Sequence, residues 1–424
     1  MTRTLHFTNA YHPTSGGIRT FYRALLAAAA DHQRAIALVV PADRDDEERV
    51  GRHGRIYYVQ ARPAPAFDRR YRTILPDAYL PIRGSRIARI LLAERPDLVE
   101  ICDKYALFYL AAMLRKDWLP SLPRPTLVGL SCERMDDNLR AYLGGSRLGR
   151  RFTRWYVRHI YGPPFDYHVA NSDYTADELR QCLWDRQADF IQVCPMGVDA
   201  DWFGARHHDP LLRRSLLERA GGGPASTLLL YAGRLSPEKN VGLLVDALVR
   251  LVHPREHGGP DYRLVIAGDG PLRARLAADA AQRAPGRVLM LGSVDSREVL
   301  ARCYASADVF VHPNPREPFG IAPLEAMASG VPVVLPSAGG VLAYAGSHNA
   351  WMATPEPGAF AHAIRAAVDA PDPARLHAAR ATADAHRWDR IAARYFTLYD
   401  ELDARFRART AQPCAEEARP RVPA

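Results

Sequence analysis

The sequence predicts an α/β protein with two doubly wound parallel sheets that face each other across a cleft. The chain has 424 residues, about twice the length of an ordinary single domain. Short apolar, β-branched runs alternate with helix-forming segments in two successive blocks, the pattern of parallel sheets covered by helices. Each block has a glycine-bearing turn after an early strand, which is where such sheets bind their ligands.

The first block begins with a strand at 4–8, and Gly16-Gly17 separates this strand from a helix at about 18–30. A glycine pair at such a junction lets backbone N–H groups approach an oxyanion. Residues 61–86 are rich in Arg and Pro and predict a long irregular loop. Further buried strands are expected at 35–41, 56–60, 98–102, 126–131, 166–170 and 190–194.

The second block begins with a strand at 228–232, after which Ser236-Pro237 predicts a helix start with Pro at its first position. Arg234 and Lys239 flank this predicted start, where the helix dipole favours anions. Only three of the 56 basic residues are lysines. Arginine is the usual cation of this chain, so a lysine at this place indicates either phosphate binding or a structural ion pair. Further strands are expected at 264–267 and 288–291.

Residues 308–340 are the stretch around which the second block is organised. A buried strand at 308–312 is followed by a loop with Glu317, a turn at Gly320, a helix at 321–329 and a strand at 331–335. This βαβ unit provides an anion-binding corner at the helix N-terminus. Glu317 and Glu325 are eight positions apart, so both can face one ligand. Without other information, two solvated surface glutamates would be the better explanation of the pair.

The composition bounds the location and the partners of the protein. No run of 18 apolar residues is present and the first residues lack the apolar centre of a signal peptide, so we expect a cytoplasmic protein. The six cysteines are scattered and do not have zinc-site spacing. The net charge of +9 suits phosphorylated ligands, an anionic membrane or nucleic acid. No nucleic-acid-binding signature is visible, and we expect no such partner.

The glutamates at 317 and 325, with seven residues between them, resemble the paired glutamates of the retaining GT-B glycosyltransferases of family 4. Four other stretches resemble that family in the same order along the chain, so the resemblance covers nearly the whole sequence. These stretches are SGGIRTFYRAL at 15–25, ANSDYTADEL at 170–179, VCPMGVDADWF at 193–203 and YAGRLSPEKNVGLLVDAL at 231–248.

The resemblance implies the GT-B fold and a division of the chain into four parts. Residues 1–196 would form an acceptor-side Rossmann-like domain, and residues 197–385 a second one that binds the nucleotide sugar. Residues 386–410 would form a helix that packs back on the first domain. Residues 411–424 have the composition of a disordered tail.

The resemblance also implies the activity, which is transfer of a hexose of mannose or glucose type from a GDP- or UDP-linked donor to an acceptor hydroxyl. The acceptor would be a lipid, a lipid-linked sugar or a saccharide in cell-envelope glycolipid or polysaccharide synthesis. No cofactor and no metal ion are expected, because two cations and helix dipoles can stabilise the leaving diphosphate. The implied catalytic residues are Arg234, Lys239 and Glu317. The implied donor-binding residues are Gly16, Gly17, Glu133, Gly320, Ile321 and Glu325.

Two positions depart from the family pattern. Many members have a histidine after the strand at 126–131, where this chain has Ser131-Cys132-Glu133. Glu133 either takes over the contact to the donor sugar or pairs with an arginine. Ala343 lies near a position where many members have a glutamate. Asp199-Ala200-Asp201 spells the metal motif of a different glycosyltransferase fold, and we interpret it as a coincidence within a linker.

Two alternatives from other classes remain open. A sugar-nucleotide epimerase of GT-B form would need several acid–base residues in the cleft. A noncatalytic nucleotide-sugar-binding protein would keep the fold and lose Arg234, Lys239 or Glu317, all of which are present.

Residues 140–159 contain six arginines and no acid. If the segment from Leu148 is helical, the aromatic residues at 152, 155, 156 and 159 form a stripe beside a basic face. A basic amphipathic helix with tryptophan is typical of the interface of an anionic membrane. The sequence therefore indicates peripheral attachment through residues 147–159, on the inner face of the cytoplasmic membrane. The alternative is that the aromatic side chains face the core of the domain.

Overall fold

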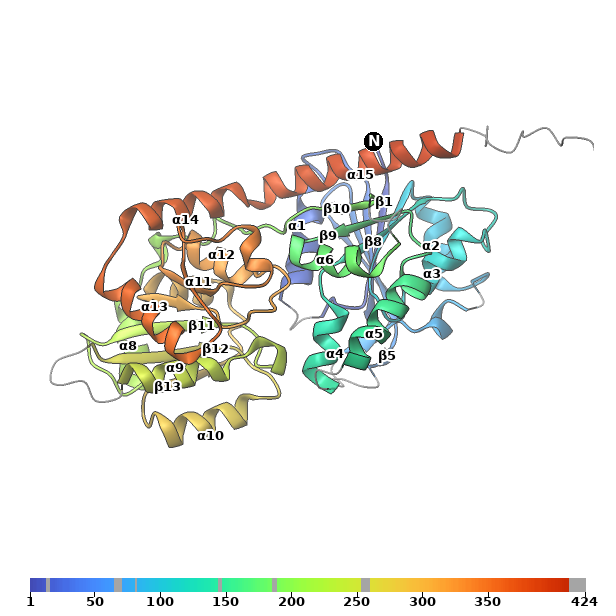
Figure 1. Cartoon of the computed structure of the whole chain (residues 1–424). Coiled ribbons are helices and arrows are strands. Elements are labelled where there is room, and N and C mark those ends of the chain that lie inside the picture. Colours follow the sequence, from blue (N-terminus) through green and yellow to red (C-terminus); the bar gives the residue numbers. More distant parts are fainter. Residues whose placement is uncertain are drawn as a thin grey trace, which may run out of the picture.

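The computed structural model describes residues 1–12, 16–64, 71–80, 82–143, 147–184, 189–252 and 260–411. The chain forms two parallel sheets, each covered by helices, and a long C-terminal helix runs along both halves (Figure 1). Apart from Ala411, which ends this helix, the predicted tail at 411–424 lies outside the described residues. Among the described helices, none is both long enough and apolar enough to cross a membrane.

The first sheet has eight strands in the order β10-β9-β8-β7-β1-β2-β4-β3, all parallel except the edge strand β3. The sequence analysis missed β3, because its DEERV segment has no apolar alternation. The strand lies at the edge of the sheet, where it pairs with β4. A short antiparallel pair, β5 (Arg62–Pro63) and β6 (Arg72–Thr73), interrupts the loop predicted at 61–86. The strands of the sheet are β1 (Thr4–Thr8), β2 (Ile36–Ala42), β3 (Asp46–Val50), β4 (Gly54–Gln60), β7 (Leu98–Cys102), β8 (Thr126–Ser131), β9 (Tyr167–Ala170) and β10 (Ile191–Val193).

The second sheet has six strands in the order β13-β12-β11-β14-β15-β16, all parallel. Its central strands are buried on both faces and consist mainly of Leu, Val, Ile and Ala, as expected of a sheet covered on both sides. The strands are β11 (Thr227–Ala232), β12 (Tyr262–Ala267), β13 (Val288–Gly292), β14 (Val309–Val311), β15 (Val333–Pro336) and β16 (Trp351–Ala353).

Helices surround both sheets, and the helices predicted at 18–30, 321–329 and 386–410 are present with bounds within a few residues of the predicted ones. The helices of the first half are α1 (Gly17–Ala28), α2 (Arg86–Glu94), α3 (Phe108–Arg115), α4 (Met135–Leu143), α5 (Arg147–Tyr156) and α6 (Asp173–Cys182), with a 3-10 turn η1 (Pro76–Ala78) and a π-helical turn η2 (Val157–Tyr161). Those of the second half are α8 (Pro210–Arg219), α9 (Gly242–Val252), α10 (Arg273–Arg283), α11 (Arg297–Ser306), α12 (Ile321–Ala328), α13 (Pro357–Asp369) and α14 (Pro373–Ala385), with 3-10 turns η3 (Ala205–His207), η4 (Pro237–Lys239) and η5 (Gly340–Ala343).

The strand order reverses direction once in each sheet. In the first sheet β1 lies between β2 and β7, so the chain leaves β1 first to one side and later to the other. In the second sheet β11 lies between β12 and β14 in the same way. Loops that leave such a switch point diverge and open a crevice at the carboxyl ends of the strands. The glycine turn before α1 and the two loops after β11 and β14 therefore occupy the places where doubly wound sheets bind ligands.

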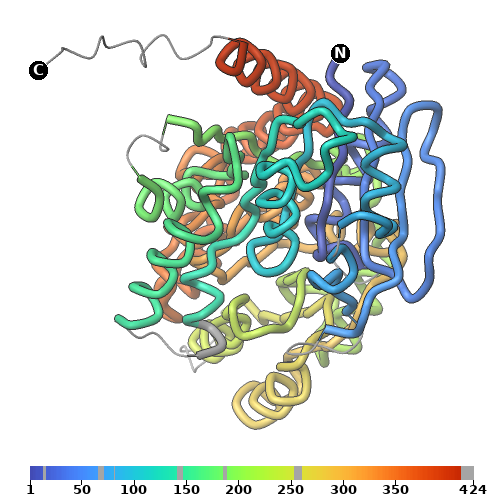
Figure 2. Tube along the Cα trace, turned by 90° about the vertical axis from the view of Figure 1, so that its right-hand side faces the viewer, coloured from blue at the N-terminus to red at the C-terminus, as the bar shows by residue number. Residues whose placement is uncertain are grey.

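The C-terminal helix α15 (Trp388–Ala411) begins on the second half and lies against the first (Figures 1 and 2). Its buried face bonds to three parts of the first half. The Tyr395 hydroxyl donates to the Cys194 carbonyl at 2.8 Å, and the Thr126 hydroxyl donates to Asp403 at 2.8 Å. The Tyr399 hydroxyl donates to Glu100 at 2.5 Å, and this fully buried carboxylate also contacts His6 and Tyr22. These contacts hold the two halves on one helix.

Candidate functional site

The loops after β11 and β14 begin side by side, because the two strands are neighbours in the sheet. The first loop ends at Lys239 and the second contains Glu317. The Lys239 Nζ lies 2.9 Å from Glu317 Oε1 and 2.8 Å from Oε2, although 78 residues separate them in sequence. Asn314 donates to Glu317 Oε2 at 2.9 Å, and His312 Nε2 lies 3.2 Å from the same oxygen. Two of the three predicted catalytic residues therefore form one ion pair at the switch point.

The prediction that a helix starts at Ser236 is wrong in detail. Residues Pro237–Lys239 form a single 3-10 turn, and Asn240 ends the turn in the left-handed conformation at φ 54°. The side chain of Ser236 bonds to Glu238 instead of capping a helix, and α9 begins only at Gly242. Asparagine adopts the left-handed region more readily than most residues, so it allows this early stop. Lys239 thus reaches the site from a turn and not from a helix N-terminus.

The loop that carries Glu317 turns tightly enough to require glycine at two positions. Gly320, immediately before α12, has φ 90°, a region that L side chains rarely adopt. Gly340 passes so close to the same loop that a Cβ on it would lie 1.9 Å from the Pro318 carbonyl oxygen. The Gly340 N–H donates to the Glu317 carbonyl at 2.6 Å. These close approaches aim the Glu317 side chain at Lys239 and leave the N-terminus of α12 beside it.

The surroundings shift the pKa values of Glu317 and Glu325 in opposite directions. Burial alone would raise the pKa of Glu317, but the charge of Lys239 and the contacts with His312 outweigh burial and hold its pKa well below the usual range. Glu325 lies on α12, where burial raises its pKa to about 7. A hydrogen bond of 2.8 Å from the Tyr304 hydroxyl and the charge of Arg297 oppose that rise only in part. Glu317 is therefore a permanent anion, whereas Glu325 changes charge near neutral pH.

Residues of the first half face this loop directly. The Ser172 hydroxyl, at the start of α6, donates to the Pro318 carbonyl at 2.5 Å. A Cβ on Gly17 would lie 3.5 Å from Ile321 Cδ1, so the N-termini of α1 and α12 lie next to each other. The guanidinium of Arg234 lies 5.1 Å from the centre of the Tyr71 ring. The predicted residues at 16–17, 234, 239, 317 and 320–321 thus lie where the two halves meet.

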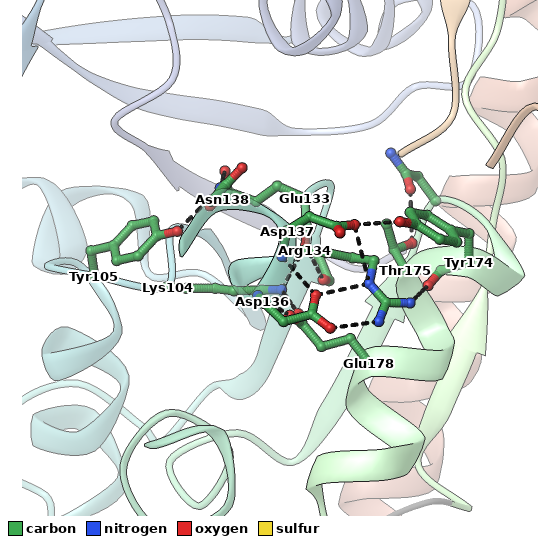
Figure 3. Close-up of polar contacts among 12 residues, drawn as sticks. Lys104, Tyr105, Glu133, Arg134, Asp136, Asp137, Asn138, Tyr174, Thr175 and Glu178 are labelled. Carbon is green, nitrogen blue, oxygen red and sulfur yellow. Dashed lines mark hydrogen bonds and ion pairs between the residues drawn. The ribbon is translucent and has the colours of Figure 1, made fainter. Parts of the chain in front are cut away.

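Glu133 lies in a separate polar network on the first half, after β8 (Figure 3). Its carboxylate accepts a hydrogen bond from Asn138 at 2.9 Å, and burial raises its pKa. Lys104 donates to the Glu133 carbonyl oxygen at 2.6 Å and to the Glu178 carboxylate at 2.5 Å. Lys104 is almost fully buried in this pair, so this lysine has a structural partner within the first half. The arginine partner that the sequence analysis considered for Glu133 is replaced by Asn138.

The sequence analysis did not anticipate the role of Arg134, the next residue of this network. Its guanidinium donates to both oxygens of Asp136, at 3.0 and 2.8 Å, and lies over the Tyr174 ring (Figure 3). The Tyr174 hydroxyl in turn donates to Asp137. Asp137 lies 3.9 Å from Arg316 of the loop before Glu317, so the network continues across to the second half. The clustered charges of Glu133 to Asp137 were the only signal for it in the sequence.

The two aspartates of the Asp199-Ala200-Asp201 segment each pair with an arginine. Arg297 binds Asp199 at 2.6 Å, and Arg387 binds Asp201 through both of its terminal nitrogens. Among the described residues, no group of three or more His, Cys, Asp or Glu side chains is arranged to hold a metal ion.

The overall fold resembles solved glycosyltransferase structures. The sucrose-phosphate synthase of Thermosynechococcus elongatus superimposes with a TM-score of 0.73 at 19% sequence identity, over 96% of this chain and 100% of that structure. The α,α-trehalose 6-phosphate synthase of Burkholderia multivorans superimposes with a TM-score of 0.68 at 16% identity, over 97% and 99%. The two facing Rossmann-like sheets are those of the GT-B class.

Sequence comparison agrees with the fold and identifies the family. Residues 15–202 match the family described as Glycosyltransferase Family 4, and residues 221–384 match Glycosyl transferases group 1. A GDP-mannose-dependent alpha-(1-6)-phosphatidylinositol dimannoside mannosyltransferase of Mycobacterium tuberculosis is 30% identical over 92% of this chain and 94% of its own length. A GDP-mannose-dependent alpha-mannosyltransferase of the same organism is 34% identical over 78% and 77%. The chain belongs to glycosyltransferase family 4 and is a glycosyltransferase.

Proposed function

We propose that this enzyme transfers a hexose from a nucleoside diphosphate sugar to an acceptor hydroxyl with retention of anomeric configuration. Mannose is favoured over glucose as the transferred hexose. The observation that supports it best is the Lys239–Glu317 pair at the switch point, opposite the N-terminus of α1. The names of the relatives favour GDP-mannose as the donor. In this proposal the donor domain comprises residues 197–385 and the acceptor domain residues 1–196, with residues 386–410 joining them.

The reaction breaks the bond between the anomeric carbon and the β-phosphate oxygen. It forms a bond from that carbon to the acceptor oxygen, and the acceptor proton leaves with the phosphate. The barrier lies in the negative charge that builds up on the diphosphate. Arg234 and Lys239, with the N–H groups at Gly16-Gly17 and at Gly320-Ile321, would stabilise that charge electrostatically. Two cations and two helix N-termini offer this stabilisation without a metal ion.

Lys239 has to change partners for this role. Its ammonium group bonds to both carboxylate oxygens of Glu317. A diphosphate that enters beside it would compete for the ammonium, and Glu317 would then accept hydrogen bonds from the hydroxyls of the transferred sugar. Asn314, which also donates to Glu317, would keep the carboxylate in place during the exchange. The ion pair would therefore hold both side chains close to the orientation required for the reaction, which lowers the entropy cost of reaching the reactive geometry.

Glu325 and Glu133 would contact the donor at two further points. Glu325, which lies on α12 eight positions after Glu317, would accept hydrogen bonds from the ribose diol. Because burial raises its pKa to about 7, ribose binding would strengthen as the carboxyl ionises. Glu133 would serve in place of the histidine that many family members have.

The acceptor would be lipid or lipid-linked, presented at an anionic membrane surface. On α5, the Phe152 and Trp155 side chains are 48% and 51% exposed, and Leu148 is also exposed. Ring contacts continue from Trp155 through His159 to the exposed Trp184. The aromatic side chains at 152 and 155 therefore do not pack in the core, which favours the membrane interpretation over its alternative. The arginines of this surface are Arg147, Arg150, Arg151, Arg154 and Arg158.

A donor panel tests the proposed activity. Purified enzyme is incubated with labelled GDP-mannose, GDP-glucose, UDP-glucose and UDP-galactose, and free sugar and nucleoside diphosphate are separated from intact donor. Slow release of both products from GDP-mannose supports the proposal. A new nucleotide sugar without release would indicate an epimerase, and binding without turnover a noncatalytic protein. The Lys239→Ala variant should lose hydrolysis, whereas Lys116→Ala, which changes an exposed lysine at the end of α3, should not.

Flotation with anionic liposomes tests the membrane surface. Binding should fall steeply with salt and with Arg150, Arg151 and Arg154 changed to Glu, because each arginine near such a surface contributes about 1 kcal/mol. A control with the same change in net charge replaces the exposed residues Arg219, Arg275 and Arg390 by Glu. Equal loss in both variants would show general electrostatics only, and no flotation at low salt would favour a soluble acceptor.

A further inference from the structure

A cavity of about 420 Å³ lies at the amino ends of β8, β9 and β10, the edge of the first sheet opposite the switch-point loops. Its wall is completed by the last turns of α15. The lining residues that matter here are Arg115, Arg124, Asp166, His168, Phe190 and Arg409. Its volume is within the range of small-molecule sites, which is about 300–1,000 Å³.

Three arginines from different parts of the chain converge on one carboxylate in this cavity. Arg124 lies 2.8 Å from Asp166 Oδ1, Arg115 lies 3.2 Å from the same oxygen, and Arg409 lies 3.9 Å from it. The Asp166 side chain is buried, and its other oxygen also accepts the Leu127 N–H at 3.0 Å. Arg124 and this N–H already satisfy the carboxylate. Arg115 and Arg409 therefore bring positive charge beyond what Asp166 requires.

The surplus charge is not neutralised by the rest of the lining. Among the described residues that line the cavity, Asp166 is the one acid, so three guanidinium groups and one carboxylate leave a charge of about +2 at neutral pH. His168 does not add to it, because burial and the charge of Lys104 lower its pKa to about 3. A dianion would balance this surplus.

Two of the three guanidinium groups lie over aromatic rings. Arg124 lies 4.7 Å from the centre of the Phe406 ring, and Arg409 lies 5.0 Å from that of Phe190. Stacking on one face leaves the N–H groups at the edge of the guanidinium plane for hydrogen bonding. All three side chains also keep contact with solvent, with exposed fractions from 28% to 46%. A ligand can therefore reach prepositioned donors.

We propose that this cavity binds the phosphate group of a small phosphomonoester, at a site separate from the donor site. The phosphate would lie between Arg115 and Arg409, which Asp166 and Phe190 orient, and would accept paired hydrogen bonds from their planar guanidinium groups. A phosphomonoester carries close to two negative charges at neutral pH, which matches the surplus, whereas a carboxylate carries one. Because Arg409 belongs to α15, the ligand would fasten the end of this helix to the first sheet.

Calorimetric titration with glycerol phosphate tests this proposal on the full chain. The decisive variant is Arg115→Gln with Arg409→Gln, and its matched control is Arg405→Gln, an exposed arginine one turn earlier on α15. Wild type and control should bind, and the double variant should bind at least about tenfold more weakly. The Lys239→Gln variant, altered at the donor site, should bind as wild type does.

A second substitution guards against misfolding of the double variant. Thr410→Glu places an acid at the exposed rim of the cavity and should weaken binding without removing an arginine. No binding by wild type at about 10 mM glycerol phosphate would overturn the proposal, since that would place Kd above the millimolar range. Loss of binding in Lys239→Gln with full binding in the arginine variant would overturn it too, because the phosphate would then occupy the donor site.

Discussion

Replacement of Lys239 by methionine should separate the structural effect of the Lys239–Glu317 pair from its effect on the reaction. Methionine keeps the length of the side chain and removes its charge. Glu317 is buried, and without Lys239 its strongest remaining donor is the Asn314 amide. The substitution therefore leaves a nearly buried carboxylate without its cation.

The expected loss of stability follows from the burial of the two partners. Exposed ion pairs contribute about 0–1 kcal/mol, and breaking a fully buried pair costs about 3–5 kcal/mol. The side chains of Lys239 and Glu317 are 24% and 10% exposed, so this pair lies between the two cases. We expect Lys239→Met to lower the free energy of unfolding by about 2 kcal/mol. Glu317→Gln combined with Lys239→Met should restore most of this loss, because no unpaired charge remains.

Turnover should not recover in the double variant. Loss of one preorganised cation at the diphosphate should lower kcat by about 10²-fold, and loss of the sugar contact should add to that. Urea unfolding and donor hydrolysis are measured on wild type, both single variants and the double variant, with Lys116→Met as the control. Wild-type turnover in a folded Lys239→Met protein would refute the catalytic role. A double variant as unstable as Lys239→Met would refute the coupling.

The pH dependence has a definite sign. The pKa of Glu317 is lowered in the folded protein, so its ionised form stabilises the fold above the ordinary carboxyl pKa, and this contribution is lost as pH falls. In Lys239→Met the carboxyl can protonate under milder acid. The difference in unfolding free energy between wild type and Lys239→Met should therefore shrink as the pH falls below neutral.

Three further predictions concern the two glutamates, the metal ion and the C-terminal helix. Glu317→Ala should lower kcat, whereas Glu325→Ala should mainly raise the donor KM. Since the pKa of Glu325 is about 7, the wild-type donor KM should fall as the pH rises from about one unit below that pKa to about one unit above it. A donor KM that does not change with pH would contradict the ribose contact. Donor hydrolysis should survive EDTA, and strict dependence on added Mg²⁺ or Mn²⁺ would contradict the metal-free mechanism. Tyr399→Phe should cost about 1–3 kcal/mol of unfolding free energy by removing a donor from the buried Glu100, whereas Tyr109→Phe, at a tyrosine that is 43% exposed, should cost little. Equal values for both would contradict the account of how α15 docks.

The sequence alone determined the fold class and most of the elements. Continuous apolar runs, glycine turns and helix-forming segments predicted both blocks, and the strands at 4–8, 98–102 and 126–131 have the predicted bounds. These features depend on local propensity and burial pattern, which can be read along the chain. The strand β3 was missed because its residues show neither.

The tertiary structure alone decided which residues meet. The Ser236 turn ends at Asn240, so Lys239 is delivered by a 3-10 turn whose length depends on a left-handed residue that propensity does not predict. Parallel pairing of β11 with β14 brings Lys239 to Glu317, and the packing of α15 brings Arg409 to Asp166. Burial raises the pKa of Glu325, whereas at Glu317 the charge of Lys239 and the contacts with His312 outweigh burial and lower the pKa. Pairing partners and burial depend on residues that are close in space but distant in sequence. Local sequence patterns therefore do not predict them.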